Sequence, residues 1–414
     1  MDKTLLKGEY YVTGKSLPHT MSPDIYTRLG LNYGVKEFQT EDEFVSYVNS
    51  RSYDGINVTI PYKQTVIPCL DYISEEAKEI GAVNTVVNRN GKLYGYNTDC
   101  YGMQKGFEEY GIVIGGKKVV ILGSGGTAKC AQYVAVKLGA KSVKICSRSG
   151  EYGYDDLYRD IDAEVIINTT PVGMFPNVEA KVIDLKRLPS VKELYDVVYN
   201  PLTTAIVTEA KALGLKAGNG LGMLVWQGIK AYELYTDSKC SDEVAQNILN
   251  EIYSDKRNVV LIGMPGCGKS TYGKRIANKL NKDFYDADEE FFNTFGVTPS
   301  EVITTKGEPT FRDMESEVIA SLSARLGAVI STGGGSVLRE VNRKRLKANG
   351  TVVFIDRDIT LLPSKGRPLS QEHGVGKLYA EREPIYRDFA DITIATGKDT
   401  VIDEAVDRII ELLK

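Results

Sequence analysis

The stretch VVLIGMPGCGKST, Val259 to Thr271, is the strongest indication of fold in the C-terminal part of the chain. Its apolar start leads into GMPGCGKS, residues 263–270, which matches the phosphate-loop pattern GxxxxGK[ST] at every fixed position. In such a loop backbone N–H groups surround phosphate, Lys269 reaches the β- and γ-phosphates, and Ser270 can hold Mg²⁺. The next residues show an apolar face at helical spacing: Ile276, Ala277 and Leu280. The stretch predicts a strand, a phosphate-binding loop and a helix of an α/β domain.

A second glycine-rich loop of looser design, GSGGTA at residues 123–128, lies earlier in the chain. An apolar strand over 117–122 precedes it, apolar residues then repeat at helical spacing, and SVKIC, residues 142–146, is typical of a strand. This βαβ pattern indicates a dinucleotide site. After the second strand the chain has SRS, residues 147–149, where NAD-specific proteins carry an acidic residue. A cation between hydroxyls suits a 2′-phosphate, so the sequence favours NADP over NAD.

Bulk properties restrict the class of protein. A chain of 414 residues exceeds one ordinary core, so two or three domains are expected. A net charge of -4 argues against a general nucleic-acid binder, and no apolar run is long enough to span a bilayer. Six scattered cysteines without a CxxC pair suit a reducing cytoplasm. We expect a cytoplasmic protein whose partners are small-molecule substrates, not nucleic acid or membrane, and homo-oligomerisation stays open.

Composition also limits the chemistry, because only two histidines are present and acid–base work must fall on Lys, Asp, Glu or Tyr. In the first region GINVTIPY, residues 55–62, alternates apolar and polar residues as a half-buried strand does. Residues 221–235 and 241–253 are typical of two helices, and the stretch 149–164 has room for about one short helix. The predicted limits are 1–253 for the first domain (substrate lobe 1–101 plus 219–253, NADP-binding lobe 102–218), 254–258 for a linker and 259–414 for the second domain.

Five motifs follow the phosphate loop in order: YDADEE, FRDMES, STGGGS, GRPL and EREPIY. With them, the chain from about residue 257 to its end resembles shikimate kinase, a P-loop α/β protein of the nucleoside-monophosphate-kinase-like fold. The resemblance implies ATP and Mg²⁺ as cofactors. It implies that Asp288 binds shikimate and helps to accept the proton of the attacking hydroxyl, and that Asp286 supports the Mg²⁺ shell. It also places Arg367 on a lid over the transferring phosphoryl group.

The residue sets that this resemblance implies are larger. Guanidinium forks suit the substrate carboxylate, and glycines let backbone approach the ring. Catalysis is assigned to Lys269 and Asp288, and the metal to Ser270 and Asp286. The ATP set is Gly263, Met264, Pro265, Gly266, Cys267, Gly268, Lys269, Ser270, Thr271 and Arg367. The shikimate set is Asp288, Arg312, Gly333, Gly334, Gly335 and Arg382.

The first domain carries its own ordered motifs: NVTIPYK, GAVNT, NTD, VIINTTPVGM, YDVVYNP and GLGMLVWQ. Together they resemble shikimate dehydrogenase over nearly all of residues 1–253. The resemblance implies a two-lobed α/β fold with a Rossmann-like NADP lobe. It implies a catalytic dyad in which Lys63 delivers a proton while NADPH delivers hydride to the C3 carbonyl of 3-dehydroshikimate, and Asp99 orients Lys63. An adjacent carboxylate favours the ammonium form of Lys63.

The dehydrogenase resemblance also implies two binding sets. In the substrate set, Thr20, Ser22 and Tyr199 would hold the carboxylate, and Thr59, Asn84 and Gln227 would hold ring hydroxyls, beside Lys63 and Asp99. The NADP set is Gly123, Ser124, Gly125, Gly126, Thr127, Ala128, Ser147, Arg148, Ser149, Thr169 and Gly220.

The two resemblances together predict a bifunctional enzyme of aromatic amino-acid biosynthesis. It would reduce 3-dehydroshikimate to shikimate with NADPH and then phosphorylate shikimate to shikimate 3-phosphate with ATP. The alternative is a non-catalytic regulator that senses metabolites with the same two domains. The sequence favours the enzyme, because Lys63, Asp99, Lys269, Ser270 and Asp288 are all retained and no basic DNA-binding module is visible.

Overall fold

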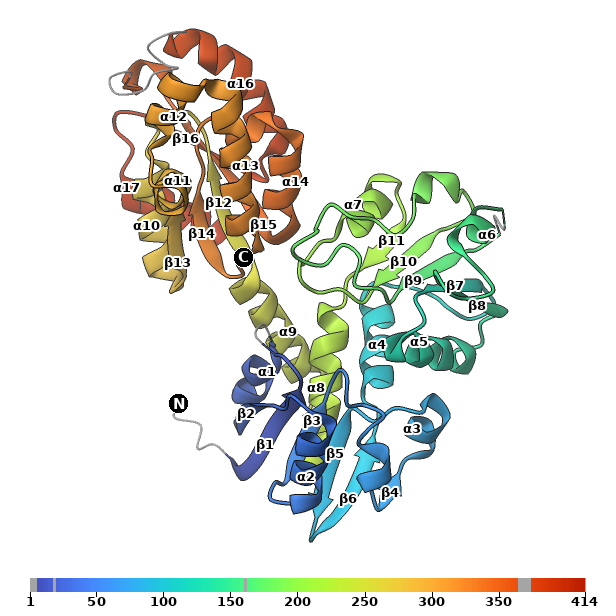
Figure 1. Ribbon diagram of the computed structural model, residues 1–414. Coiled ribbons are helices and arrows are strands. Elements are labelled where there is room, and N and C mark those ends of the chain that lie inside the picture. The colour runs from blue at the N-terminus through green and yellow to red at the C-terminus, as the bar shows by residue number, and fades with distance from the viewer. Residues whose placement is uncertain (1–5, 18–19, 160–161, 364–373, 414) are drawn as a thin grey trace. The chain divides into compact units, whose positions relative to one another are not determined.

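The computed structural model describes residues 6–17, 20–159, 162–363 and 374–413 (Figure 1). Contacts divide the described chain into two compact units. The first contains Met1–Val172, Lys181–Tyr199 and Ile206–Ile252, and the second contains Gly173–Ala180, Asn200–Ala205 and Tyr253–Lys414.

The segment predicted as a linker, residues 254–258, is not a separate loop. Helix α9, Asp242–Lys256, crosses the division between the units, and strand β12 begins at Asn258. Residues 254–256 of this segment belong to the last turn of α9, an amphipathic helix whose buried residues occur three or four positions apart. The limits given above for the domains and lobes stay predictions.

The first unit begins with a mixed six-stranded sheet of order β2-β1-β3-β5-β6-β4. β1 pairs in parallel with β2 and β3, while β5 is antiparallel to both β3 and β6. The carboxyl ends of β1, β3 and β6 and the amino end of β5 therefore lie on the same edge of the sheet. Its elements are β1 Leu6–Gly14, α1 Ser22–Arg28, β2 Leu31–Glu37, α2 Glu41–Ser50, β3 Gly55–Val58, β4 Tyr72–Ile73, α3 Glu75–Ile80, β5 Thr85–Arg89, β6 Lys92–Tyr96 and α4 Asp99–Glu109.

The strand predicted over residues 55–62 is shorter than expected, because β3 ends at Val58. Ile56 and Val58 are buried as predicted, but Ile60 is 76% exposed. The Thr59 N–H still bonds to the Thr13 carbonyl, and the Tyr62 N–H then bonds to the Thr59 carbonyl in a turn. Pro61 has no N–H for a ladder, so the pairing cannot continue through it. The turn places the residues after β3 on the edge described above.

A second, parallel sheet of order β11-β10-β9-β7-β8 follows. Its strands alternate between two cores: Val119 and Ile121 face α4 and α5, while Val120 and Leu122 face the layer that contains α7. As predicted, one short helix lies between β8 and β9. The elements are β7 Lys118–Leu122, α5 Gly126–Lys137, β8 Ser142–Cys146, α6 Tyr154–Arg159, β9 Val165–Asn168, β10 Glu193–Asp196, α7 Ala205–Ala212, β11 Lys216–Gly218 and α8 Leu221–Thr236.

Helices α4 and α8 pack closely, and Gly102 permits this contact. A Cβ atom at Gly102 would lie 2.3 Å from the Met223 carbonyl oxygen and 2.9 Å from the Gln227 backbone nitrogen. We expect Gly102→Ala to lower the free energy of unfolding of the first unit by about 1–3 kcal/mol, because the helices must move apart. Trp226, the one tryptophan of the chain, lies on α8 and is buried, so its fluorescence follows this unit during urea unfolding.

Gly126→Ala is the matched control for this prediction, because Gly126 also lies in a helix but has nothing within 4 Å of an added Cβ. Its free energy of unfolding should stay within about 0.5 kcal/mol of the wild-type value. Equal midpoints for the two variants would contradict the close approach of α4 and α8.

The second unit is a parallel sheet of order β13-β14-β12-β15-β16 between helices. Figure 1 shows α10 and α17 on one face and α13 and α14 on the other. β12 lies in the centre and is buried at every position. The elements are β12 Asn258–Ile262, α10 Lys269–Leu280, β13 Asp283–Asp286, α11 Ala287–Phe295, α12 Pro299–Lys306, α13 Glu308–Ala324, β14 Ala328–Ser331, α14 Glu340–Asn349, β15 Gly350–Arg357, α16 Val375–Phe389, β16 Ile392–Thr396 and α17 Ile402–Leu413.

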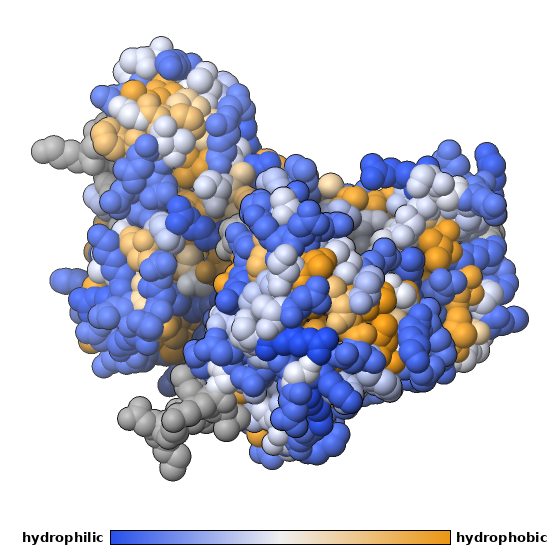
Figure 2. Space-filling model, turned by 60° about the horizontal axis from the view of Figure 1, so that its bottom comes forward, coloured by the Kyte–Doolittle hydropathy of each residue, from blue (hydrophilic) through white to orange (hydrophobic). Residues whose placement is uncertain are grey.

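The surface in Figure 2 is mostly hydrophilic, with apolar residues in separate patches. Among the residues that the structure describes, no helix combines the length and apolar character needed to cross a membrane.

Candidate functional site

The shared edge of the first sheet holds an ion pair between Lys63 and Asp99. Lys63 follows the turn after β3, and Asp99 opens α4 after β6. Lys63 Nζ lies 2.6 Å from Asp99 Oδ2, and both side chains are largely buried. Burial alone would lower the pKa of Lys63, but the charge and hydrogen bond of Asp99 outweigh it, so the pKa is raised. Lys63 is therefore an ammonium group that can donate a proton.

Asn84, just before β5, connects this ion pair to other predicted substrate residues. Asn84 Nδ2 donates to Asp99 Oδ1 at 2.9 Å, and Asn84 Oδ1 accepts from the Thr98 N–H at 2.7 Å. Thr98 Oγ1 lies 3.3 Å from Gln227 Oε1 on α8. The structure thus joins Lys63, Asp99, Asn84 and Gln227 in one network at one edge, although they come from four separate motifs.

The remaining predicted substrate residues are Thr20, Ser22, Thr59 and Tyr199. Thr20 and Ser22 precede and begin α1, with their hydroxyl oxygens 3.3 Å apart. Thr59 directly follows β3, and Tyr199 lies in the loop after β10. Burial raises the pKa of Tyr199, so its phenol stays protonated. These four side chains provide hydroxyl groups, which suit a carboxylate or a polyol.

The predicted NADP residues gather at the carboxyl edge of the second sheet, where ligands of such sheets bind. Gly123 follows β7, Ser147 follows β8, Thr169 follows β9, and Gly220 precedes α8 after β11. All pairings between these strands are parallel, so the four loops leave the same edge. Arg148 lies at this edge, after β8, and is exposed to solvent.

Two of these glycines permit close backbone approach. Gly123 has φ +106°, and a Cβ there would lie 2.9 Å from Thr169 Oγ1. A Cβ at Gly220 would lie 1.9 Å from the Val197 carbonyl oxygen. A side chain at either position would push the loops apart, so glycine allows them to pack closely at this edge. The N-terminus of α5 lies next to Gly123, and the N–H groups of a helix N-terminus favour the binding of pyrophosphate.

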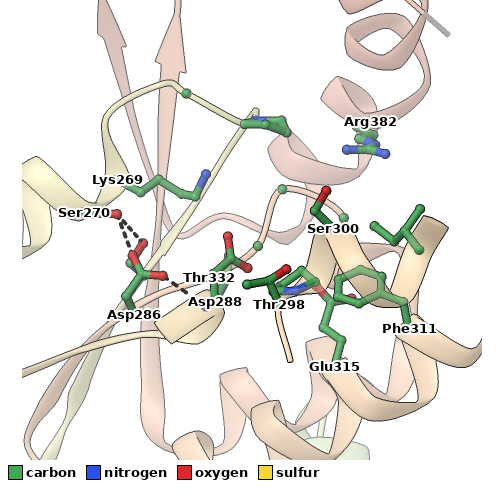
Figure 3. Close-up of a pocket in the computed structure, with 18 of the residues that line it drawn as sticks. Lys269, Ser270, Asp286, Asp288, Thr298, Ser300, Phe311, Glu315, Thr332 and Arg382 are labelled. Carbon is green, nitrogen blue, oxygen red and sulfur yellow. Dashed lines mark hydrogen bonds between the residues drawn. The ribbon is translucent and has the colours of Figure 1, made fainter. Parts of the chain in front are cut away.

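The second unit has a cavity of about 540 Å³ at the end of β12. Figure 3 shows Lys269, Asp288 and Arg382 pointing into the same space from different elements. The cavity is lined from five segments: the phosphate loop, the start of α11, the region of α12 and α13, the glycine loop after β14, and α16. Among residues 6–17, 20–159, 162–363 and 374–413, no cluster of three or more His, Cys, Asp or Glu side chains could hold a metal.

The phosphate-loop side of the cavity is arranged around Lys269. Lys269 Nζ bonds to the Gly263 and Met264 carbonyl oxygens at 3.0 and 3.1 Å. Met264 and Cys267 have buried side chains and do not line the cavity, so these two predicted ATP residues can offer only backbone groups, as the glycines of the loop do. Gly268 has φ +100°, a conformation that glycine adopts without strain.

Two carboxylates face Lys269 across the cavity. Asp286 accepts from Ser270 Oγ at 2.5 Å and from the Asp288 N–H at 3.0 Å, which caps α11. The Asp288 carboxylate is accessible from the open cavity, yet desolvation by the surrounding protein raises its pKa, and the charge of Asp286 adds to this effect. Asp288 is therefore a better proton acceptor than an ordinary aspartate.

The opposite side of the cavity presents guanidinium groups. Arg312 pairs with Glu315 at 2.7 Å and with Glu308 at 2.8 Å, and both Arg312 and Arg382 are buried. A Cβ at Gly335 would lie 2.2 Å from an Arg312 nitrogen, so the glycine makes room for the guanidinium. The glycine loop is held from behind, because the Tyr386 hydroxyl donates to the Gly334 carbonyl.

Some site residues escaped prediction, and one predicted residue cannot be placed. Glu315 lines the cavity and orients Arg312. Glu315 follows Arg312 by three residues on the same helix face, and this spacing could have predicted the ion pair from the sequence. Thr98, inside the NTD motif, was also missed. Arg367 lies outside the described residues.

Comparisons with known proteins agree with both sets of motifs. The shikimate kinase family model matches residues 265–414, and the model of the shikimate dehydrogenase substrate binding domain matches residues 12–86. A shikimate dehydrogenase (NADP(+)) from Caldicellulosiruptor bescii is 35% identical over 273 residues, which cover 59% of this chain and 94% of that protein.

Solved structures give the same result for the first domain. A chorismate mutase/shikimate 5-dehydrogenase fusion protein from Clostridium acetobutylicum matches with a TM-score of 0.57 at 31% identity, covering 59% of this chain and 97% of that chain. Shikimate 5-dehydrogenase from Thermus thermophilus, in complex with NADP(H) and shikimate, matches with a TM-score of 0.53 at 28% identity, covering 58% of this chain and 98% of that chain. The chain therefore belongs to the shikimate dehydrogenase family and continues into a shikimate kinase domain, so that it is a fusion of a dehydrogenase and a kinase.

Proposed function

We propose that this protein catalyses two consecutive reactions, the NADPH-dependent reduction of 3-dehydroshikimate and the ATP-dependent phosphorylation of the resulting shikimate. The observation that carries the proposal is the presence of two complete sets of reactive side chains in one chain. Lys63 Nζ lies 2.6 Å from Asp99 in the first unit. In the second unit Lys269, Ser270, Asp286 and Asp288 line one cavity.

In the reduction, bound NADPH supplies the hydride to the C3 carbonyl carbon. Lys63 donates its proton to the carbonyl oxygen, and Asp99 holds the ammonium in place and stabilises its charge. Asn84 and Gln227 bind the ring hydroxyls, and Thr20, Ser22 and Tyr199 bind the carboxylate. Arg148, with Ser147 and Ser149, would hold the 2′-phosphate that distinguishes NADP from NAD.

In the phosphorylation, the 3-hydroxyl of shikimate attacks the γ-phosphorus of ATP and ADP leaves. Asp288 accepts the hydroxyl proton, which its raised pKa favours. Lys269 and the loop N–H groups stabilise charge on the phosphoryl oxygens. Ser270 and Asp286 supply hydroxyl and carboxylate oxygens, the donors that Mg²⁺ prefers, so we assign the magnesium site to them. Arg312 and Arg382 bind the carboxylate.

A coupled assay of the purified protein tests this function. With 3-dehydroshikimate and NADPH alone, we expect NADPH absorbance to fall and shikimate to accumulate. Addition of ATP and Mg²⁺ should convert shikimate into shikimate 3-phosphate, and NADH should replace NADPH poorly. A protein that binds both metabolites without turnover would instead support the regulatory alternative, for which no observation in the structure argues.

A pH profile tests the role of Asp99. Lys63 must carry its proton to act as an acid, and Asp99 raises its pKa, so reduction should be lost only as pH rises through that raised pKa. In Asp99→Asn, burial is no longer opposed by a charge, and the basic limb of the kcat profile should move to lower pH. We also expect kcat to fall by about 10²-fold.

Asp242→Asn is the matched control, because Asp242 is an exposed aspartate that also pairs with a lysine, Lys105, at 3.0 Å. Its profile should follow the wild type. An unmoved basic limb in Asp99→Asn would show that Lys63 is not the titrating acid.

A further inference from the structure

A buried chain of hydrogen bonds leads from Tyr26 and Tyr33 to Asn84. Thr85, the first residue of β5, lies at its centre and is fully buried. Thr85 Oγ1 lies 3.2 Å from Asn57 Nδ2 and 3.0 Å from Asn84 Oδ1. Thr85 thus connects Asn57, a residue of β3 with no role in the proposed reaction, to Asn84. The Asn84 amide in turn contacts the Asp99 carboxylate.

Two backbone groups fix the orientation of both amides. The Thr98 N–H can only donate, so the Asn84 atom at 2.7 Å from it is the oxygen. The Asn84 carbonyl can only accept, so the Asn57 atom at 3.4 Å from it is the nitrogen. Asn84 Nδ2 is then directed at Asp99 Oδ1, 2.9 Å away.

Two tyrosines supply the first donors of the chain. The Tyr26 and Tyr33 hydroxyls each donate to Asn57 Oδ1 at 2.6 Å, and their rings stack with centroids 4.0 Å apart. Burial raises the pKa of both phenols, so both keep the proton they donate. With its oxygen occupied by two donors, Asn57 can only offer N–H groups to Thr85.

Thr85 has a single hydroxyl proton, and two oxygens lie within its reach: Asn84 Oδ1 at 3.0 Å and Thr98 Oγ1 at 3.1 Å. Thr98 Oγ1 itself lies 3.2 Å from Asn84 Oδ1, so either route leads to the Asn84 amide. Asn84 in turn donates to Asp99, which accepts from Lys63 on its other oxygen. The side chains of Asn57, Thr85 and Asn84 are hydrogen-bonded to one another, and Thr98 adds further bonds to the Asn84 amide. A buried polar network whose groups are all hydrogen-bonded holds a unique geometry.

We propose that Thr85 is a positioning residue of the dehydrogenase, and that the chain Tyr26/Tyr33–Asn57–Thr85–Asn84 holds Asp99 and Lys63 in their reactive geometry. The proposal rests on the roles given above to Lys63 and Asp99. It extends them to side chains that need not touch substrate or cofactor. Reduction by the wild type and its loss in a Lys63 variant test those roles separately.

The test compares Thr85→Val, which keeps the shape and removes the hydroxyl, with Thr85→Ser, which keeps the hydroxyl. We expect Thr85→Val to lower kcat for 3-dehydroshikimate reduction by about 10- to 100-fold, the usual effect of removing a partner that orients a functional group. KM should rise by less than kcat falls, and Thr85→Ser should stay within about threefold of the wild type.

The pH profile of kcat separates positioning from general destabilisation. The groups that face Lys63 are Asp99, Cys100 and Cys130, and Asp99 has the main pKa-raising effect among them. If Asp99 loses its orientation, the basic limb should move to lower pH in Thr85→Val and not in Thr85→Ser. An unmoved limb with an equal loss of kcat in both variants would overturn the proposal.

Thr13→Val is the matched control, because Thr13 is also fully buried and its hydroxyl bonds only to the Asn57 carbonyl at 2.9 Å among the contacts described. It should keep its kcat and its pH limb. Equal losses in Thr13→Val and Thr85→Val would overturn the proposal, as would an unchanged kcat in Thr85→Val.

If Trp226 fluorescence shows that Thr85→Val does not fold, Tyr33→Phe provides a second test of the proposal. It removes one of the two donors to Asn57 and keeps the ring stack. We expect a fall in kcat of about 3- to 10-fold with the basic limb moved in the same direction. A wild-type profile in Tyr33→Phe would overturn the proposal.

Discussion

Lys63→Ala is expected to abolish reduction of 3-dehydroshikimate and to leave the phosphorylation of added shikimate intact. Removal of a positioned general acid costs typically 10²–10⁴-fold. Lys63 also lies at the edge where we propose that the substrate binds, so kcat should fall by at least about 10³-fold. NADPH absorbance measures the first activity, and ADP release in the presence of shikimate, ATP and Mg²⁺ measures the second.

Lys78→Ala is the control for this substitution. Lys78 pairs with Glu75 at 2.6 Å, the same length as the Lys63–Asp99 pair, but it lies on the surface with half of its side chain exposed. Removal of this exposed pair should change neither activity. Trp226 fluorescence shows whether the first unit stays folded in both variants. Reduction near the wild-type rate in folded Lys63→Ala would disprove the assignment of the acid.

Residues that lie together in sequence were the ones that sequence patterns could predict. The phosphate loop is contiguous, so its strand, loop and helix were predicted and then confirmed as β12, Gly263–Gly268 and α10. The pairs Asn84–Asp99 and Lys63–Asp99 span 15 and 36 residues. Each of these residues belongs to a separate contiguous motif, so the resemblance to the family predicted that they share one site.

Residues whose role depends only on tertiary partners were not predictable. Asn57 reads as a polar position of an alternating strand, yet it is buried because Tyr26 and Tyr33 from other elements satisfy its oxygen. Thr98 meets Gln227 across 129 residues of sequence. Alternation predicts which face a residue takes, but it does not predict which buried polar groups find partners.

Lys269→Ala is expected to remove the second activity and spare the first. Lys269 is buried at the start of α10, where its Nζ bonds to two carbonyl oxygens and a thiol among the contacts described. None of these partners carries a negative charge, so the charge of the ammonium can act on phosphate oxygens. Loss of one preorganised charge of this kind costs about 10²–10³-fold in kcat. Shikimate should then accumulate in the coupled assay, because NADPH is still consumed while ADP is not released.

The same helix provides the control. Lys279→Ala removes a lysine that lies on the surface of α10 and pairs with Asp407 at 2.5 Å, far along the helix from the loop. It should leave kinase turnover unchanged, since an exposed ion pair contributes little. ATP-dependent turnover that survives in Lys269→Ala would exclude the phosphate loop as the site of transfer. Loss of reduction in Lys269→Ala would show instead that the first site depends on the second. The two sets of reactive residues are separate, so we do not expect this result.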